Sequence, residues 1–407
     1  MTSTLFSQPE TVEQFSALTE KIKSENYFRA PVLFGIGREM RTGSGTLASM
    51  RYPAVSGLGQ NLGTAAILQH VLHSLGVLDT TLPIASVPIS TDLIDKMMGY
   101  FQPFEGDGKR HVNVLALRKM IGALMRGDAR HIQGKDRPVV TFIFEDVAPQ
   151  GVEDATLKLY GLSLRHFRPN SLNLDKIFTK LPNVAWIGDK VYDKDDVDQM
   201  LMEAAFGDTP FSPHMVDKFP LYIHRINAID MGVRITDQHK VRLGAYLGEG
   251  TTLMPGASYV NFNAGTDGGM IEGRISSSSF VRKGSDVGGG ASILGVLSGD
   301  NDVPIEIGRN CLLEANSVTG IPLGDACIVA AATEILAGTK VKVGINGHPS
   351  NGTVVRAEIL AGVDGITFRR NSQGGFMEAV RTSRNLKRLA EIGKGENSLN
   401  HDLHSHN

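Results

Sequence analysis

The chain contains few cysteines and no excess of basic charge. Only two of its 407 residues are cysteine, Cys311 and Cys327, too few for a disulfide framework. We expect both to be buried thiols in a cytoplasmic protein, because free cysteine is among the most readily buried residues. The formal net charge is −2, so nothing in the composition predicts a nucleic-acid partner or attachment to a membrane surface.

Long apolar segments are also absent. No apolar run reaches the roughly 18 residues that a membrane-spanning helix needs. Met1 is followed by the polar stretch TSTLFSQPETVEQF, which has no basic region before an apolar one, so we expect no signal peptide. A chain of 407 residues is too long for one ordinary core, which predicts two or three domains.

Residues 1–230 have the pattern of an α/β domain. Helical spacing of apolar residues predicts helices over 11–25, 61–78, 114–125 and 194–205, the first with Thr11 as its N-cap. Apolar runs predict buried strands over 137–146 and 183–192. The stretch GDGKR at 106–110 is no phosphate-binding loop, because that motif requires other residues where Pro103 and Arg110 stand. No catalytic motif is evident in this domain.

The pattern changes at residue 231. Of the 46 glycines, 20 fall between 232 and 344. Aliphatic or small residues also recur every six positions, with two jumps of ten and one interruption: Ile235, Val241, Leu247, Leu253, Tyr259, Gly265, Ile271, Val281, Val287, Ile293, Ile307, Leu313, Leu323, Val329, Ile335 and Val341. A period of six predicts a left-handed parallel β-helix built from hexapeptide repeats over residues 231–345. Another kind of parallel sheet would need crossover helices that this stretch lacks.

Two features flank or interrupt the repeats. The stretch SGDNDVP breaks the period and must leave the coil as a loop, which serves binding or is a tolerated surface excursion. Residues 346–407 predict a small C-terminal cap with short strands and a helix, since the open end of a solenoid must be covered. Three histidines near the C-terminus, His401, His404 and His406, fit a solvated tail better than a metal site.

The flat faces of such a solenoid pack well in threes, which predicts a homotrimer. Clefts between protomers then offer long slots edged by backbone amides, and an elongated molecule such as coenzyme A suits such a slot. The stretch VGGGASILG at 287–295 is no dinucleotide fingerprint, because Ile293 stands where that motif needs glycine. Its glycines either let a ligand lie against the backbone or serve only corner geometry.

Apart from Asp267, the glycine-rich stretch NAGTDGGMIEGRI carries one acid and one base, Glu272 and Arg274. His239 is the single histidine within the repeats, whereas a zinc hydratase on this scaffold would need three converging imidazoles. Glu272 is therefore the best acid/base candidate, because a carboxylate in a dry cleft can take or give a proton near neutral pH. The alternative is a structural ion pair with Arg274.

Several long motifs occur in an order that resembles one family. They are VRLGAYLGEGTTLMPG, VNFNAGTDGGMIEGRIS, GSDVGGGASILGVLSGD, LLEANSVTGIPLGD, ILAGTKV and FRRNSQGG. From about 232 to 375 the chain is similar to the tetrahydrodipicolinate N-succinyltransferase family, in its form with a long N-terminal region. This resemblance implies transfer of succinyl from succinyl-CoA to the amine of open-chain tetrahydrodipicolinate (2-amino-6-oxopimelate) in the diaminopimelate route to lysine. It also implies a homotrimer with active sites between protomers.

The resemblance implies catalytic roles for Glu272 and Gly295 and a CoA-binding role for Arg274. Glu272 matches the family's catalytic glutamate, described as a base toward the amine or as a carboxylate that briefly carries the acyl group. Arg274 would contact the CoA ester. Gly295 matches a glycine opposite the glutamate, whose N–H could stabilise the thioester oxyanion.

The remaining matched positions are implied to bind CoA. Gly289, Ser292, Ala315 and Gly338 match positions along the slot, and Arg356 stands where the family has a lysine. The stretch Arg369, Arg370, Asn371 and Ser372 matches positions near the CoA phosphates, which the bidentate fork of arginine suits.

The chain also departs from the family. His239 and the segment Pro255–Ser258 replace acidic residues that bind a divalent cation in one branch, so we expect no metal. Glu314 stands where glycine is usual, and Ala330–Ala332 replace the usual EAG. Another CoA-dependent N-acyltransferase, for example one that uses acetyl-CoA, therefore remains an alternative. A non-enzymatic solenoid fits less well, because the face is irregular rather than a uniform ladder.

Overall fold

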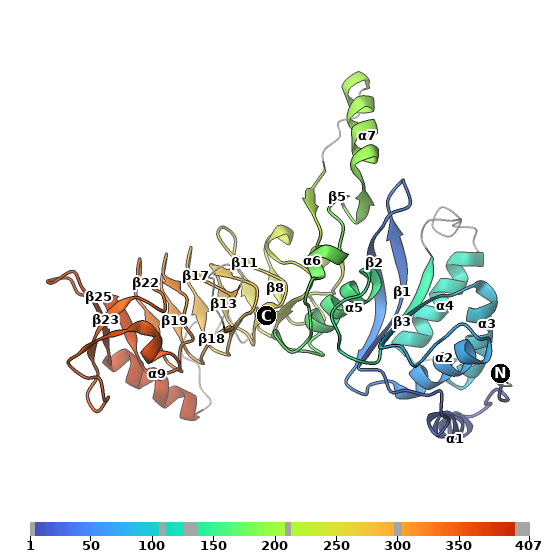
Figure 1. The fold of residues 1–407 in the computed structure, drawn as a ribbon, viewed down its shortest axis with the longest axis horizontal. Helices are drawn as coiled ribbons and strands as arrows, with labels where there is room; N and C mark the ends of the chain where they lie inside the picture. Colours follow the sequence, from blue (N-terminus) through green and yellow to red (C-terminus); the bar gives the residue numbers. More distant parts are fainter. Residues whose placement is uncertain (1–4, 106–110, 126–136, 208–212, 297–302, 395–407) are drawn as a thin grey trace. The chain divides into compact units, whose positions relative to one another are not determined.

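The computed structural model describes residues 5–105, 111–125, 137–207, 213–296 and 303–394 (Figure 1). The chain forms two compact units. The first consists of Met1–Gly161 and Leu172–Pro220, and the second of Leu162–Ser171 and Leu221–Asn407. No helix of the described residues is long and apolar enough to cross a membrane.

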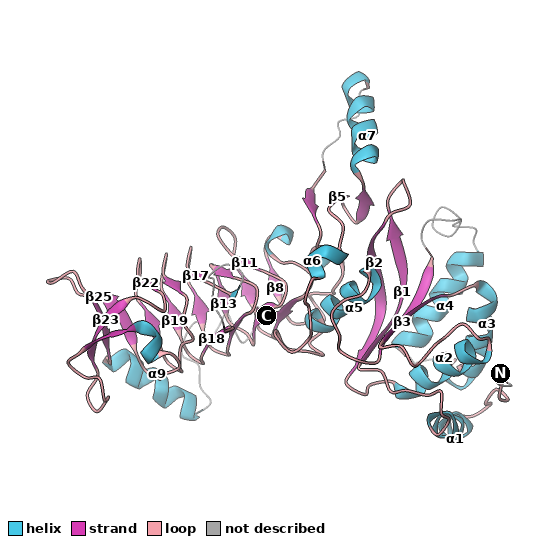
Figure 2. Ribbon diagram, in the orientation of Figure 1, coloured by secondary structure: helices cyan, strands magenta, loops and turns pink. Residues whose placement is uncertain are grey.

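The first unit is built on a four-stranded antiparallel sheet with the order β2-β1-β4-β3. Its strands are β1 (Leu33–Arg41), β2 (Leu47–Gly57), β3 (Ile84–Pro88) and β4 (Pro138–Ile143). The helices that share its apolar core are α1 (Val12–Lys23), α2 (Leu62–Ser74), α3 (Thr91–Tyr100) and α4 (Val112–Met125). Phe34, Leu68 and Phe142 lie in this core and are almost completely buried. Figure 2 shows the helices of this unit in cyan and the strands of its sheet in magenta.

The helices expected in this unit are present. Helix α1 begins after Thr11, whose hydroxyl accepts a hydrogen bond from the backbone N–H of Gln14 at 3.2 Å, as expected for an N-cap. Helix α7 (Lys194–Phe206) begins with a capping box formed by Asp193 and Asp196. Two further helices are α5 (Val152–Ser163) and α6 (Ile177–Lys180).

The prediction of a single strand over 183–192 was wrong. This stretch forms a hairpin of β5 (Val184–Ile187) and β6 (Lys190–Tyr192), with Gly188 at φ +57° in the turn. Strand β7 (Met215–Asp217) pairs with the other edge of β5. Trp186 fills the small core beneath this sheet and donates its indole N–H to the backbone oxygen of Asp217 at 2.9 Å. The β1–β2 hairpin was not predicted from the sequence.

The second unit is the predicted left-handed parallel β-helix, with three sheets. The long sheet contains β8 (Arg234–Ile235), β10 (Thr252–Leu253), β13 (Met270–Ile271), β16 (Asp286–Val287), β19 (Leu312–Leu313), β21 (Ile328–Val329) and β25 (Thr367–Arg370). The middle sheet contains β11 (Tyr259–Val260), β14 (Arg274–Ile275), β17 (Ser292–Ile293), β20 (Val318–Thr319) and β22 (Glu334–Ile335). The third sheet contains β9 (Ala245–Leu247), β12 (Ala264–Thr266), β15 (Ser279–Val281) and β18 (Ile305–Ile307).

The two jumps of ten in the repeat have a simple cause. Within each jump, one further residue points inward and divides the ten positions into a step of four and a step of six. This residue is Ile275 in the first jump and Thr319 in the second, and both are fully buried. Ile275 follows Ile271 by four positions because the corner between their strands is short. Two predicted inward positions were wrong by one residue. Val260 and Thr266 are fully buried and pair with the inward residues of neighbouring coils, instead of Tyr259 and Gly265.

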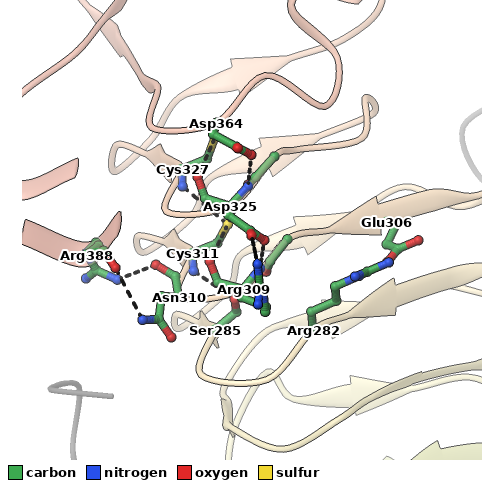
Figure 3. Close-up of polar contacts among 12 residues, drawn as sticks. Arg282, Ser285, Glu306, Arg309, Asn310, Cys311, Asp325, Cys327, Asp364 and Arg388 are labelled. Carbon is green, nitrogen blue, oxygen red and sulfur yellow. Dashed lines mark hydrogen bonds and ion pairs between the residues drawn. The ribbon is translucent and has the colours of Figure 1, made fainter. Parts of the chain in front are cut away.

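The far end of the coil is closed by the predicted cap. Strands β23 (Lys340–Gly344), β24 (Val354–Arg356) and β26 (Met377–Val380) extend the long sheet through β25. Helix α9 (Ser383–Lys394) is anchored to the solenoid by Arg388, whose guanidinium donates to the backbone oxygen of Asn310 at 2.9 Å (Figure 3). Asn385 likewise donates to the backbone oxygen of Ala326 at 2.8 Å.

Both cysteines are buried free thiols, as expected. Ser285, Cys311 and Cys327 stack on successive coils, and the backbone N–H of Cys327 donates to Cys311 Sγ at 3.3 Å (Figure 3). Burial raises the pKa of the Cys311 thiol. The same edge carries an ion pair between Arg309 and Asp325, which joins the two coils that also hold Cys311 and Cys327.

Candidate active site

Glu272 lies in a column of residues along one edge of the solenoid, which we call the first corner, where each coil passes from the long to the middle sheet. The column starts in earlier coils, where the Met254 N–H donates to Ile271 O at 3.0 Å. The backbone N–H of Glu272 donates to Val287 O at 2.7 Å, and equivalent bonds join each later coil to the next. The residues so stacked are Glu272, Gly288, Glu314, Ala330 and Arg369. From Glu272 onward, the column therefore leads to Arg369 at the cap.

The Glu272 carboxylate faces the next coil at Gly289. A Cβ atom built on Gly289 would lie 3.5 Å from Glu272 Oε2 and within 4 Å of no other distant atom. Among the described residues, no ion pair within 4.0 Å joins Glu272 to Arg274, and neither side chain has another ionic partner there. Arg274 instead points out from the middle sheet, where β14 aligns it between Tyr259 and Ser292.

The three glycines at 288–290 are subject to different physical constraints. A Cβ on Gly288 would lie 2.7 Å from Leu313 O, and one on Gly290 would lie 2.3 Å from the Asn316 side chain at a backbone φ of +71°. Both positions therefore require glycine for corner geometry. Gly289 has no such constraint, so its lack of a side chain keeps space open beside Glu272.

Gly295 and Gly338 lie at the opposite edge of the middle sheet, which we call the second corner. Gly295 follows β17, and a Cβ there would be 1.7 Å from Ser277 O, so the backbone is packed too closely for any side chain. Gly338 follows β22, is exposed, and would have nothing within 4 Å of its Cβ. Because the strands are parallel, one protomer does not bring Glu272 and Gly295 together.

The arginines at the cap end are held by specific contacts. Arg369 Nε donates to Glu378 Oε1 at 2.8 Å, and Arg370 donates to the backbone oxygen of Gly375 at 2.9 Å. Asn371 Nδ2 donates to Glu378 Oε2 at 3.2 Å. Ser372 is exposed in the turn that follows β25.

Arg356 lies on β24, at the edge of the cap sheet, and pairs with Glu358 at 2.8 Å. The register places it beside Lys340 of β23. Glu378 was not predicted from the sequence. The signal was present, because an RRNSQGGFME hairpin places an arginine opposite a glutamate once its turn is located.

Two of the departures from the family contact each other. Glu314 Oε2 accepts the backbone N–H of Ala331 at 3.1 Å, and Glu314 Oε1 accepts from Arg384 of α9 at 3.1 Å. The added carboxylate at the first corner is therefore satisfied by the altered AAA segment and by the cap. Its charge is balanced by Arg384.

His239 lies far along the chain from this column, in the first coils. Its backbone N–H donates to Asp237 at 2.9 Å, which lowers the pKa of that carboxyl. Among the described residues, no group of three or more His, Cys, Asp or Glu side chains is placed to hold a metal ion.

The chain is similar to known proteins over nearly its whole length. Residues 13–179 match the model of the N-terminal region of tetrahydrodipicolinate N-succinyltransferase, and residues 304–335 match the hexapeptide repeat of succinyl-transferase. A 2,3,4,5-tetrahydropyridine-2,6-dicarboxylate N-succinyltransferase from Sulfurovum is 39% identical and is aligned over 97% of this chain and 98% of its own. The enzyme of that name from Helicobacter pylori is 36% identical over 92% of this chain and 98% of its own.

A solved structure gives the same result. The crystal structure of a 2,3,4,5-tetrahydropyridine-2-carboxylate N-succinyltransferase from Campylobacter jejuni has 38% sequence identity to this chain and a TM-score of 0.83. The match covers 93% of this chain and 99% of that one. The likeness therefore includes the first unit, where the sequence offered no catalytic motif.

Proposed function

The chain belongs to the tetrahydrodipicolinate N-succinyltransferase family, and we propose that it transfers succinyl from succinyl-CoA to the amine of open-chain tetrahydrodipicolinate. The product is the N-succinyl amide, a step in the diaminopimelate route to lysine. The observation that carries this proposal is the first-corner column, which joins Glu272 to the arginines of the cap. Its length and chemistry suit an elongated acyl donor with phosphates at one end.

The proposed chemistry places Glu272 as a general base. Its carboxylate takes a proton from the substrate amine as the nitrogen attacks the thioester carbonyl. The tetrahedral intermediate then collapses, the C–S bond breaks, and the CoA thiolate leaves and takes a proton. Gly295 would donate its N–H to the oxyanion, and Arg274 would contact the ester. The lack of an ionic partner for Glu272 among the described residues supports this role, because its oxygens stay available to the amine.

The rest of the column forms the proposed CoA slot. Gly289 and Ala315 carry little or no side chain, so a pantetheine arm can lie against the backbone. Ser292 is the polar neighbour of Arg274 on the middle sheet. At the cap, Arg369, Arg370, Asn371, Ser372 and Arg356 would bind the phosphates, with arginine forks matching phosphate oxygens.

We further propose a homotrimer in which each active site uses two protomers. The separation of Glu272 and Gly295 on opposite edges of the middle sheet supports this, because the proposed chemistry needs both at one carbonyl. Gly338 shares the second corner with Gly295. The first corner of one protomer would therefore face the second corner of its neighbour. We place this enzyme in the cytoplasm.

An assay of CoA thiol release with succinyl-CoA and 2-aminopimelate tests the reaction. We expect release that depends on both compounds and is much faster than with acetyl-CoA. Release with acetyl-CoA but not with succinyl-CoA would overturn the succinyl assignment. That result would favour an enzyme of the same scaffold with a different acyl preference. The departures from the family at Glu314 and Ala330–Ala332 raise this alternative.

A further inference from the structure

We infer that Glu378 is a positioning residue that sets Arg369 and Asn371 for the phosphates of the acyl donor. The inference rests on the proposed function and adds a residue to it. Glu378 lies on β26, directly opposite Arg369 of β25 in the antiparallel register. It comes from a different strand than the residues that it holds.

Each oxygen of the Glu378 carboxylate has its own partner. Oε1 accepts from Arg369 Nε at 2.8 Å, and Oε2 accepts from Asn371 Nδ2 at 3.2 Å. The Glu378 side chain is only 13% exposed, whereas that of Arg369 is 48% exposed. The carboxylate is thus a fixed point at the sheet surface, and the guanidinium extends from it toward solvent.

The contact through Nε determines what Arg369 can still bind. A guanidinium has five donors in one plane, and Glu378 uses only the one nearest the chain. Among the described residues, the hydrogen bond of the Arg369 side chain is made through Nε, and its two terminal nitrogens have no hydrogen-bond partner. They form the fork that binds two phosphate oxygens at once. A held fork loses less conformational freedom on binding than a free one, so Glu378 would raise affinity by pre-organisation.

Glu378 does not neutralise this surface. Lys342 of β23 lies opposite Glu378 in the parallel register, on the other side from Arg369. Its ammonium lies 5.3 Å from the centre of the Phe376 ring and has no carboxylate partner among the described residues. Lys340 is two positions earlier on the same exposed side of β23. The cap sheet therefore stays cationic around one carboxylate, as a polyphosphate-binding surface requires.

The test compares two acyl donors, succinyl-CoA and S-succinyl-pantetheine, which lacks every phosphate. We expect Glu378→Gln to raise the KM for succinyl-CoA about fivefold with little change in kcat. The kcat/KM for succinyl-pantetheine should be unchanged. Arg369→Lys keeps the charge but removes the Nε–H. It should therefore also raise the KM for succinyl-CoA and leave the kcat/KM for succinyl-pantetheine unchanged. Adding Glu378→Gln to Arg369→Lys should cause little further loss.

The control is Glu306→Gln, which removes the carboxylate from another exposed pair made through an arginine Nε, that of Arg282. It should leave both donors unaffected. Equal losses with both donors, or wild-type kinetics in Glu378→Gln, would overturn the positioning role while the proposed function stands. A wild-type protein inactive with both donors would overturn the proposed function as well.

Discussion

Glu272 Oε2 lies 3.5 Å from the point that a Cβ atom on Gly289 would occupy, and no other distant atom comes within 4 Å of that point. The candidate carboxylate and the bare backbone of the next coil thus face each other across open space. The neighbouring glycines at 288 and 290 are required by the corner itself. Gly289 alone of the three is not required by the corner.

Gly289→Ala should separate activity from stability. The added methyl makes an ordinary van der Waals contact with Glu272 and no clash, and the backbone there is not in the left-handed region. We expect an unchanged melting temperature and a fall of about tenfold or more in kcat/KM, because small displacements of reacting groups are costly. Wild-type kinetics would show that nothing passes close to Gly289.

Gly295→Ala, in contrast, should lower the stability of the protein. Its Cβ would be 1.7 Å from Ser277 O, which forces the two coils apart. We expect the free energy of unfolding to fall by about 2 kcal/mol or more, as for overpacked sites elsewhere. Denaturant unfolding of this variant beside Gly289→Ala measures the contrast. Equal stability of the two variants would contradict the close packing at the second corner.

Mixed oligomers test whether the site is shared between protomers. Glu272→Ala alters the first corner, and Gly338→Trp fills the second corner at a position where an added Cβ atom has nothing within 4 Å. Each variant alone should be inactive. In a co-assembled mixture, about a quarter of the sites should combine two intact corners and recover activity, given random cyclic assembly.

The control for this experiment is the same mixture without dissociation and reassembly, which should stay inactive. A mixture that remains inactive after verified subunit exchange would show that both corners serve the same site within one protomer.

His70 should make the first unit less stable in acid. The buried ring accepts the Phe6 N–H at 3.1 Å through Nε2, and its Nδ1 bonds with the Tyr27 hydroxyl at 2.8 Å. Burial, with smaller effects from His73 and Lys21, lowers the pKa of His70 from 6.5 to about 4. The unfolded chain therefore binds more protons between these values, and stability is lost as the pH falls below about 6.5.

We expect the free energy of unfolding to fall by about 2 kcal/mol from this group between pH 7 and pH 5. Denaturant titrations at the two pH values measure it. His70→Gln removes the titrating ring, so its stability should change less over the same interval. Identical changes in wild type and variant would show that His70 is not the group responsible.

The repeat of six was sufficient to predict the solenoid but not the exact path of its chain. Tyr259 and Gly265 continue the spacing, yet Val260 and Thr266 point inward, because an extra corner residue shifts the register by one. Ile275 was missed because its corner is short. Local spacing identifies the repeat, whereas corner lengths depend on contacts between coils.

The candidate site shows the same limit. Its residues were identified by motifs, and the structure aligns Glu272, Gly289 and Ala315 on one corner. Glu378 carries no motif and became visible only through its strand pairing with Arg369. The proposed sharing of a site between two protomers is not encoded in any local pattern, because it would depend on assembly.

The most direct test of the central claim is the turnover of Glu272→Gln with succinyl-CoA and 2-aminopimelate. Glutamine keeps the shape of the side chain and removes its capacity to accept a proton. We predict a fall in kcat of about 10³-fold, typical of the loss of a general base, with CoA binding and melting temperature unchanged. Turnover near that of the wild type would contradict the assignment of Glu272 as the catalytic carboxylate.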